Sequence, residues 1–381
     1  MKLYIGADFV STDVNRSYFE SGDIESLVGK EVYEILHASD LNIFNLEVPL
    51  ADVSTPIEKF GNNLESPSKT IHGYARLQPL FLTLANNHSL DQGVQGLKAT
   101  TKLLEEHNIL YGGVGNDQEE AKKPFIFEKD GIRVGLYMCS EREFTIASAH
   151  KAGGANPFDV LESFDDVAEL KAQCDYVIVL YHGGKEFYRY PSPMLQKYCR
   201  KFVDKGGADL VVCQHSHCIG SRENYKDGSI IYGQGNFIFD SNFFTKYGEF
   251  IRESLLLAVD VTKDHFIVNE IPIRKTDIGI RLATSSEANE ILADYEARNA
   301  QIKDPHFVLQ AYKAFADTHV NRYLREFLGR SFVVRALNAL FLRKLVNLIL
   351  GKTSYLAIQN YLECEAHHEL FLRGIKNINK K

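Results

Sequence analysis

Leu80-Phe81-Leu82-Thr83-Leu84-Ala85-Asn86-Asn87-His88 is a short apolar run that ends abruptly in two amides and an imidazole. A run of this length, followed directly by polar residues, is typical of a buried β-strand. The same arrangement occurs five more times in the chain. The other runs end at Asp8, at Asn45-Leu46-Glu47, at His182-Gly183-Gly184, at Gln214-His215-Ser216-His217 and at Gly235-Asn236. This repetition predicts an α/β fold and places the candidate functional residues at the ends of its strands.

The apolar runs alternate with stretches of helical period, which predicts a layered α/β domain. We expect strands at 3–5, 41–44, 80–84, 134–137, 176–180, 210–212 and 230–232, and helices around 24–38, 94–107, 159–173 and 193–205. Two later runs, 255–259 and 266–268, predict a closing hairpin with its turn near Lys263-Asp264. Helical periodicity dominates after about residue 280. We therefore expect an α/β domain over 1–275 and a helical C-terminal region over 276–381.

Composition excludes several classes of protein. The chain has 381 residues, of which 45% are hydrophobic and 24% charged, so it is globular in composition. The formal net charge of −7 argues against nucleic acid as a partner. The six cysteines form no CxxC pair, which excludes a zinc ribbon.

The expected location is the cytoplasm. The first apolar run, at residues 3–5, is far shorter than the core of a signal peptide. The most apolar segment, 330–352, is interrupted by Arg335, Arg343 and Lys344. Its uninterrupted apolar stretches are therefore too short to predict a membrane-spanning helix. Two interpretations of 330–352 stand: a helix buried in the protein or its interface, which we favour, and a peripheral contact with the inner face of the membrane.

The polar residues after the strands should converge, because open α/β sheets bind ligands beyond the carboxyl ends of their strands. Two carboxylates, one amide and three imidazoles form a mixed oxygen and nitrogen ligand set. Such a set suits one or two divalent transition ions, namely Mn, Zn, Fe, Ni or Co, better than calcium. In a regular strand, neighbouring residues point to opposite faces of the sheet. The positions of His215 and His217 just after a strand therefore raise the question of how both side chains could reach one site. Both can bind metal only if the backbone turns after the strand.

At these residues the chain resembles CapA/PgsA-type proteins, the capsule and poly-γ-glutamate biosynthesis relatives within the calcineurin-like metallophosphoesterase superfamily. The matching motifs are Gly6-Ala7-Asp8, Asn45-Leu46-Glu47, Leu84-Ala85-Asn86-Asn87-His88 with Asp91 and Gly93, His182-Gly183-Gly184 with Glu186, His215-Ser216-His217, and Tyr232-Gly233-Gln234-Gly235-Asn236-Phe237. The resemblance covers residues 6 to 237 and implies a four-layer αββα sandwich, with metals held in loops at the strand ends.

The resemblance also implies roles for individual residues. Asp8 and His217 would hold one metal, Glu47 would take the bridging position, and Asn87, His182 and His215 would hold the second metal. His88 would stabilise or protonate the leaving oxygen, with Asp91 orienting its ring. We expect substrate contacts from Asn45, Asn86, Lys185, Glu186, Arg189 and Asn236; for the charged residues among them, solvated loop positions are the alternative.

Two departures from the superfamily pattern concern the metals. Val10 stands where the first motif has a histidine, and Glu47 replaces an aspartate, so a single occupied metal site is an alternative to two. Two functions follow. The first is a metal-dependent hydrolase that uses metal-activated water on a phosphoester of a small molecule or glycan in capsule or cell-surface polysaccharide biosynthesis. The second is a non-catalytic, metal-stabilised factor that supports capsule or polyglutamate synthesis or export.

Overall fold

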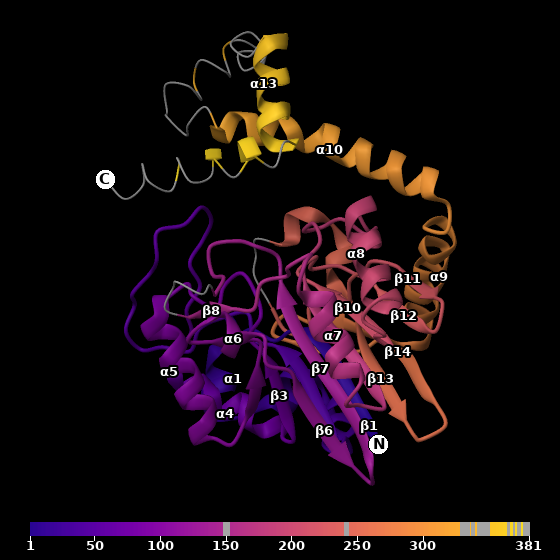
Figure 1. The fold of residues 1–381 in the computed structure, drawn as a ribbon. Coiled ribbons are helices and arrows are strands. Elements are labelled where there is room, and N and C mark those ends of the chain that lie inside the picture. The colour runs from indigo at the N-terminus through magenta and orange to yellow at the C-terminus, as the bar shows by residue number, and fades with distance from the viewer. Residues whose placement is uncertain are drawn as a thin grey trace. The chain divides into compact units, whose positions relative to one another are not determined.

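The computed structural model of the chain describes residues 1–147, 153–239, 244–327, 336, 340, 351–363, 366–368, 370, 371 and 375. The chain divides into two compact units, Met1–Tyr312 and Lys313–Lys381. The first unit contains both large sheets (Figure 1). The segment 330–352 lies almost entirely outside the described residues, so a contact of that segment with a membrane stays a prediction.

The first sheet has seven strands and is mixed. Its order is β15 (Ile280–Leu282), β14 (Phe266–Lys275), β13 (Glu253–Val261), β1 (Lys2–Asp8), β2 (Leu41–Asn45), β3 (Leu80–Thr83) and β4 (Leu110–Gly112). Neighbours from β1 to β4 run parallel, whereas β13, β14 and β15 pair antiparallel. The carboxyl ends of β1, β2 and β3 therefore lie at the same edge.

The second sheet has six strands. Its order is β11 (Arg222–Tyr225), β12 (Gly228–Ile231), β10 (Leu210–Gln214), β9 (Tyr176–His182), β7 (Ile132–Ser140) and β6 (Phe125–Lys129). The four central strands are parallel and the two outer ones antiparallel to their neighbours. A separate two-stranded ribbon joins β5 (Val114–Gly115) to β8 (Gly154–Ala155).

Helices cover the outer faces of the two sheets. On the first sheet lie α1 (Arg16–Ser21), α2 (Ile24–Val28), α3 (Lys30–His37), α4 (Ile71–Tyr74) and α5 (Gly93–Glu106), and on the second α7 (Ser163–Lys171) and α8 (Pro193–Asp204). The remaining helices of the described residues are α6 (Gln118–Ala121), α9 (Ser285–Gln301), α10 (Pro305–Phe327) and α13 (Lys352–Glu363), with 3-10 turns η1 (Ser68–Thr70), η2 (Ala75–Leu77), η3 (Phe244–Tyr247) and η4 (Glu249–Arg252).

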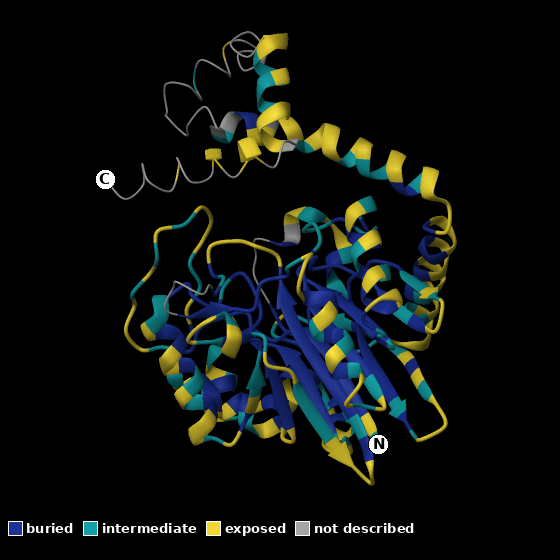
Figure 2. Cartoon of the chain, viewed as in Figure 1, coloured by how far each residue is buried: buried dark blue, intermediate teal, exposed yellow. Residues whose placement is uncertain are grey.

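Three apolar cores separate four layers, which confirms the expected αββα sandwich. One core joins α1–α5 to the first sheet, a second lies between the two sheets, and a third joins the second sheet to α7 and α8. Alternate residues of one strand enter different cores: Ile178 and Leu180 face the other sheet, and Val179 faces the helices. Both faces of these strands are buried, as the dark core of Figure 2 shows. This explains why they appear in the sequence as unbroken apolar runs.

Two of the expected helices need correction. The stretch 24–38 is two helices, because Gly29 has a φ of +75° and ends α2 before α3 begins. The stretch expected as a helix from 159 begins only at Ser163. The hairpin of β13 and β14, with its turn at 262–265, is confirmed.

The expected domain boundary at residue 275 falls inside the first compact unit. Strand β15 pairs with β14, and α9 places Ile291 and Tyr295 in the core between the sheets. In addition, Arg298 on α9 donates from Nε to the carbonyl of Gly220 at 2.6 Å. Fading strand periodicity therefore marks the end of the sheets, whereas the packed unit extends to Tyr312.

Phe44 anchors the packing behind the first strand ends, and its truncation is expected to destabilise the fold. Its ring is fully buried, 4.4 Å from the ring of Phe237 between centroids. A Cβ on Gly6 would lie 2.3 Å from this ring, so strand β1 passes directly over it. We expect Phe44→Ala to lower the free energy of unfolding by about 3–5 kcal/mol because it leaves a cavity.

Chemical denaturation of the metal-free protein, followed by circular dichroism, measures this loss. Phe144→Ala is the matched control, because Phe144 is 48% exposed. A difference between the two variants below about 1 kcal/mol would contradict the packing described for Phe44.

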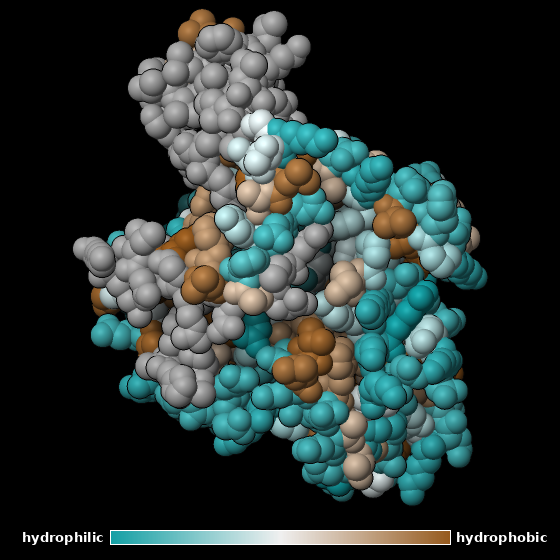
Figure 3. Space-filling model, turned by 45° about the horizontal axis from the view of Figure 1, so that its top comes forward, coloured by the Kyte–Doolittle hydropathy of each residue, from teal (hydrophilic) through white to brown (hydrophobic). Residues whose placement is uncertain are grey.

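The surface shown in Figure 3 is mostly hydrophilic, with hydrophobic side chains in small separate groups among the coloured residues. Single exposed apolar side chains such as Leu161 are normal on globular proteins. No helix in the described part of the chain is both long and apolar enough to cross a membrane.

Candidate metal centre

The candidate ligands come from both sheets and meet where their parallel strands end. Asp8 is the last residue of β1, and His182 is the last residue of β9. The others follow strands: Glu47 after β2, Asn87 after β3, His215 and His217 after β10, and Asn236 after β12. The convergence expected from the sequence therefore occurs, with each sheet contributing one half of the site.

One group of ligands consists of Glu47, His182 and His215, all buried. His182 Nε2 lies 3.2 Å from Glu47 Oε1 and 3.1 Å from His215 Nδ1. The same Nε2 lies 3.0 Å from Asn87 Oδ1, which adds an amide oxygen to the group. One carboxylate, one amide oxygen and two imidazoles thus surround one point, a suitable donor set for a divalent transition ion.

A second group consists of Asp8, Glu47 and His217. Asp8 Oδ2 lies 3.3 Å from His217 Nδ1, and that nitrogen lies 2.9 Å from Asn236 Oδ1. In each group the ligand atoms lie within 4.8 Å of one another. Glu47 belongs to both groups, which is the arrangement that a bridging carboxylate requires.

The buried carboxylates of the two groups indicate whether a cation would be stable at this site. Both oxygens of Glu47 and Oδ2 of Asp8 are buried, and in the described residues they have no hydrogen-bond partner apart from the imidazoles of the same groups. Their nearest polar neighbours are the imidazole nitrogens of the same groups. A buried carboxylate without a donor costs several kcal/mol unless a positive charge offsets it. The donor set therefore fits one or two divalent ions.

His215 and His217 both reach the site because the backbone reverses between them. Both residues have positive φ, +86° for His215 and +54° for His217, in a region that non-glycine residues rarely adopt. This turn follows Gln214, the last residue of β10, whose Nε2 donates to the carbonyl of Gly6 at 3.1 Å. The condition that the sequence imposes on this pair is met, and unusual backbone geometry of this kind clusters at functional sites.

The three histidines have different electrostatic environments. Burial opposes the charged form of His217, but its hydrogen bond to Asp8 and the charge of Glu47 outweigh burial and raise its pKa to about 9. Burial likewise opposes protonation of His182, yet Glu47 raises its pKa overall. For His215, burial and then the neighbouring His182 and His217 lower the pKa well below its usual value. At neutral pH the metal-free site therefore holds a proton on His217.

These pKa values predict that metal binding strengthens as the pH rises. Because the pKa of His217 is about 9 in the metal-free protein, a proton must leave before this side chain can bind metal. We expect the affinity for Mn²⁺ to rise about tenfold per pH unit between pH 6.5 and 8.5 and to level off near pH 9.

Calorimetric titration of the metal-free protein at several pH values measures this slope. His217→Gln should flatten it for the ion that His217 contacts. An affinity that does not change over this range would contradict the assignment of His217 as a ligand.

His88 lies beside the ligands and is held by Asp91. His88 Nδ1 lies 2.6 Å from Asp91 Oδ2, and its backbone N–H donates to Asn86 Oδ1 at 3.0 Å. Lys59, which no sequence motif indicates, forms an ion pair with the other oxygen of Asp91. It belongs to the irregular segment between β2 and η1, so no strand-end pattern could have revealed it.

The side chains of Asn45 and Asn86 are occupied by protein groups. Asn45 Nδ2 donates to Asp8 Oδ1 at 2.7 Å, and its Oδ1 accepts from Asn86 Nδ2 at 3.0 Å. Asn86 Nδ2 also donates to the carbonyl of Leu46 at 2.8 Å. Both residues are fully buried. This geometry favours orientation of Asp8 and Glu47 over the substrate contact expected from the sequence.

The charged residues after His182 differ in position. Lys185 is near enough to His215 that its charge contributes to lowering the pKa of that imidazole, after burial and the other histidines. Glu186 is half-buried on the same turn. Arg189 is engaged elsewhere, with Nε 3.1 Å from the carbonyl of Ile219 and a guanidinium nitrogen 2.9 Å from Asp294. Of the three, Lys185 is thus the residue best placed to meet an anionic substrate.

Val10, two residues after Asp8, is buried in the core between the first sheet and its helices. Its side chain offers no ligand atom, so the Asp8 and His217 group has fewer donors than the Glu47, His182 and His215 group.

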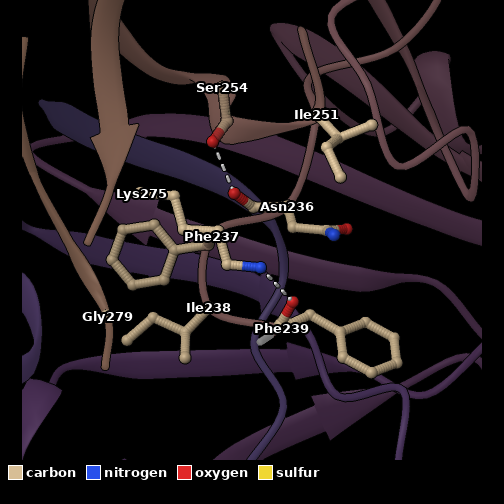
Figure 4. Close-up of a pocket in the computed structure, with 8 residues that line it drawn as sticks. All are labelled: Asn236, Phe237, Ile238, Phe239, Ile251, Ser254, Lys275 and Gly279. Carbon is tan, nitrogen blue, oxygen red and sulfur yellow. Dashed lines mark hydrogen bonds between the residues drawn. The ribbon is translucent and has the colours of Figure 1, made fainter. Parts of the chain in front are cut away.

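A small pocket adjoins the site behind Asn236 (Figure 4). Ser254 Oγ donates to the carbonyl of Asn236 at 2.6 Å, and Lys275 Nζ donates to the carbonyl of Phe239 at 3.0 Å. The lining residues are Asn236, Phe237, Ile238, Phe239, Ile251, Ser254, Lys275 and Gly279. These contacts fix the loop that presents Asn236 to His217. Asn236 therefore lies at the candidate centre, and the substrate contact expected for it stays a prediction.

Together, the sandwich and the buried carboxylate and histidine groups define a protein with a candidate metal centre at its strand ends. Residues 7–241 match the family model described as bacterial capsule synthesis protein PGA_cap, and the chain belongs to this family.

Two curated relatives carry capsule or polymer names. The chain is 31% identical over 221 residues to the capsule biosynthesis protein CapA of Bacillus anthracis, covering 56% of this chain and 54% of that protein. It is 29% identical over 222 residues to the PGA biosynthesis protein CapA of Bacillus subtilis, covering 55% and 56%. The chain spans about half the length of these curated relatives.

Solved structures resemble the chain more distantly. A putative 5′-nucleotidase from Staphylococcus aureus has a TM-score of 0.43 at 13% identity, covering 77% of this chain and 58% of that one. The calcineurin-like phosphoesterase YfkN from Bacillus subtilis has a TM-score of 0.38 at 11% identity, covering 80% and 99%. The evidence for the four-layer arrangement of this chain is the strand order of its two sheets.

Proposed function

We propose that the protein is a metal-dependent hydrolase that cleaves a phosphoester of a small molecule or glycan used in capsule or cell-surface polymer synthesis. The observation that carries this proposal is the pair of buried ligand groups that share Glu47, whose carboxylate oxygens have no hydrogen-bond partner in the described residues apart from the imidazoles of these groups. The biological setting comes from membership of the capsule synthesis family. Mn, Zn, Fe, Ni and Co are the ions that the ligand set suits.

A divalent ion in this centre would lower the pKa of a water molecule and offset negative charge on the phosphoryl group. Residues of the chain would orient the ligands, donate the proton and attract the substrate. Asn45 holds the carboxylate of Asp8, and Asn236 holds the ring of His217. Nδ1 of His88 donates to Asp91, so in the imidazolium form of the ring the second proton, on Nε2, would pass to the oxygen that leaves. Lys185 would attract the negative substrate.

The test is phosphate release by the metal-loaded full chain from a panel of phosphomonoesters and phosphodiesters, including sugar phosphates. His182→Ala serves as the variant, because the Nε2 of this residue contacts Glu47, Asn87 and His215. The proposal expects turnover that stops on chelation, returns with added metal and is absent in the variant. Full activity of His182→Ala, or activity that survives chelation, would overturn it.

A second candidate function is a non-catalytic, metal-stabilised factor in capsule or polyglutamate synthesis or export. The observation that favours it is Val10, which leaves the Asp8 and His217 group with fewer donors. A protein of this kind would bind metal and gain thermal stability from it, yet release no phosphate from any ester of the panel. The panel therefore separates the two functions.

A further inference from the structure

Lys59 is a charged side chain buried beside the candidate metal centre. Only 4% of its side chain is exposed, although an ammonium group is rarely buried without a partner. Its Nζ forms an ion pair with Asp91 and lies 3.3 Å from His88 Nδ1 and 3.4 Å from the carbonyl of Asn87. We infer that Lys59 is a positioning residue that fixes Asp91 and, through it, the ring of His88. This inference rests on the proposed hydrolase function.

The segment that carries Lys59 is bound to the turn that carries His88 and Asp91. Leu64 N–H donates to Asp91 Oδ2 at 2.6 Å, and Ile57 N–H donates to the carbonyl of Asp91 at 3.0 Å. Two further bonds join Thr55 to Gln92, both at 2.7 Å. The segment is thus fixed to the site on both sides of Lys59, which places the ammonium group in a set position.

The two oxygens of Asp91 have separate partners. Oδ1 pairs with Lys59, whereas Oδ2 accepts from Leu64 N–H and lies 2.6 Å from His88 Nδ1. Since an ionised carboxylate only accepts hydrogen bonds, the short contact places the imidazole proton on Nδ1. Nε2 then carries the proton for the leaving oxygen when the ring is an imidazolium. Loss of the ammonium group would let the carboxylate rotate and would leave its charge unbalanced, so the His88 ring would lose its fixed orientation.

The test compares Lys59→Met with Lys69→Met, in which the lysine is 64% exposed and 3.9 Å from Glu20. Lys59→Gln, which keeps an N–H donor without the charge, is the second variant if Lys59→Met unfolds. Each full-length protein is loaded with Mn²⁺ and assayed for metal per chain, thermal midpoint and hydrolysis of two monoesters. Glycerol 3-phosphate has an alkoxide leaving group that needs a proton, whereas p-nitrophenyl phosphate has one that does not.

We expect Lys59→Met to keep its metal and to lose about tenfold or more in kcat on glycerol 3-phosphate, with KM changed less than about twofold. On p-nitrophenyl phosphate the loss should stay below about threefold. In a His88→Ala background, Lys59→Met should cause no further loss, because both substitutions remove one function. Lys69→Met should behave as the wild type.

The inference would be overturned if Lys59→Met left kcat unchanged or lowered kcat equally on both esters. It would also be overturned if the loss of kcat in Lys59→Met added to that of His88→Ala. Loss of metal in Lys59→Met would also overturn it, since Lys59 would then only support the metal ligands. Failure of the proposed function is a separate result. It appears as a wild-type protein that binds Mn²⁺ and hydrolyses neither ester, and the inference then falls with it.

Discussion

Glu47→Gln is expected to remove bound metal from both ligand groups and to lower phosphoester turnover by about a thousandfold or more. Glu47 is the one carboxylate that both groups share, and the side chain is 1% exposed. Glutamine keeps the shape of the side chain but removes the negative charge that offsets a divalent ion. Elemental analysis of metal per chain, together with phosphate release, measures both effects.

Glu58→Gln is the matched control for this substitution, because Glu58 is an exposed residue of the segment that follows Glu47. The control should retain wild-type metal content and activity. If Glu47→Gln kept a full complement of metal, Glu47 would not be the shared ligand and the two groups would have to be independent.

His88→Ala is expected to separate metal binding from chemistry. His88 lies outside both ligand groups, so the variant should keep its metal. Its kcat on an alkyl phosphate should fall about 10²–10⁴-fold, because the leaving oxygen loses its proton donor. Steady-state kinetics on glycerol 3-phosphate, with metal content measured on the same sample, tests this expectation.

His37→Ala is the control for His88→Ala, since His37 is exposed on α3 with Nδ1 2.9 Å from the carbonyl of Tyr33. It should leave kcat unchanged. Metal loss that accompanies the loss of activity in His88→Ala would show that this histidine supports the ligands and does not act on the leaving group.

Much of the fold could be predicted because buried parallel strands leave a strong signal in sequence. Strand β9 is covered on both faces, so almost every residue of 176–182 is apolar, and His182 stands out at its end. The break between α2 and α3 was missed, since it depends on one left-handed glycine, Gly29, inside a helical pattern. The packed unit extends beyond residue 275 because α9 contacts the sheets through a few side chains, which periodicity does not reveal.

The site could be predicted in part for the same reason. Strand ends bring Asp8, Glu47 and the three ligand histidines together, and their order along the chain already indicates this. Lys59 could not be found in this way, because an irregular segment brings it to Asp91 through backbone hydrogen bonds. The side chains of Asn45 and Asn236 contact candidate ligands, and a motif cannot distinguish an amide that faces substrate from one that orients a ligand.

We expect the buried groups around Glu47 to form a metal centre. The most direct test is metal per chain in the full-length protein, purified without chelator and supplied with Mn²⁺, measured beside His215→Ala. We expect stoichiometric metal in the wild type and its loss from the group of Glu47, His182 and His215 in the variant. A wild type that binds no metal, or a variant that binds as much as the wild type, would contradict it.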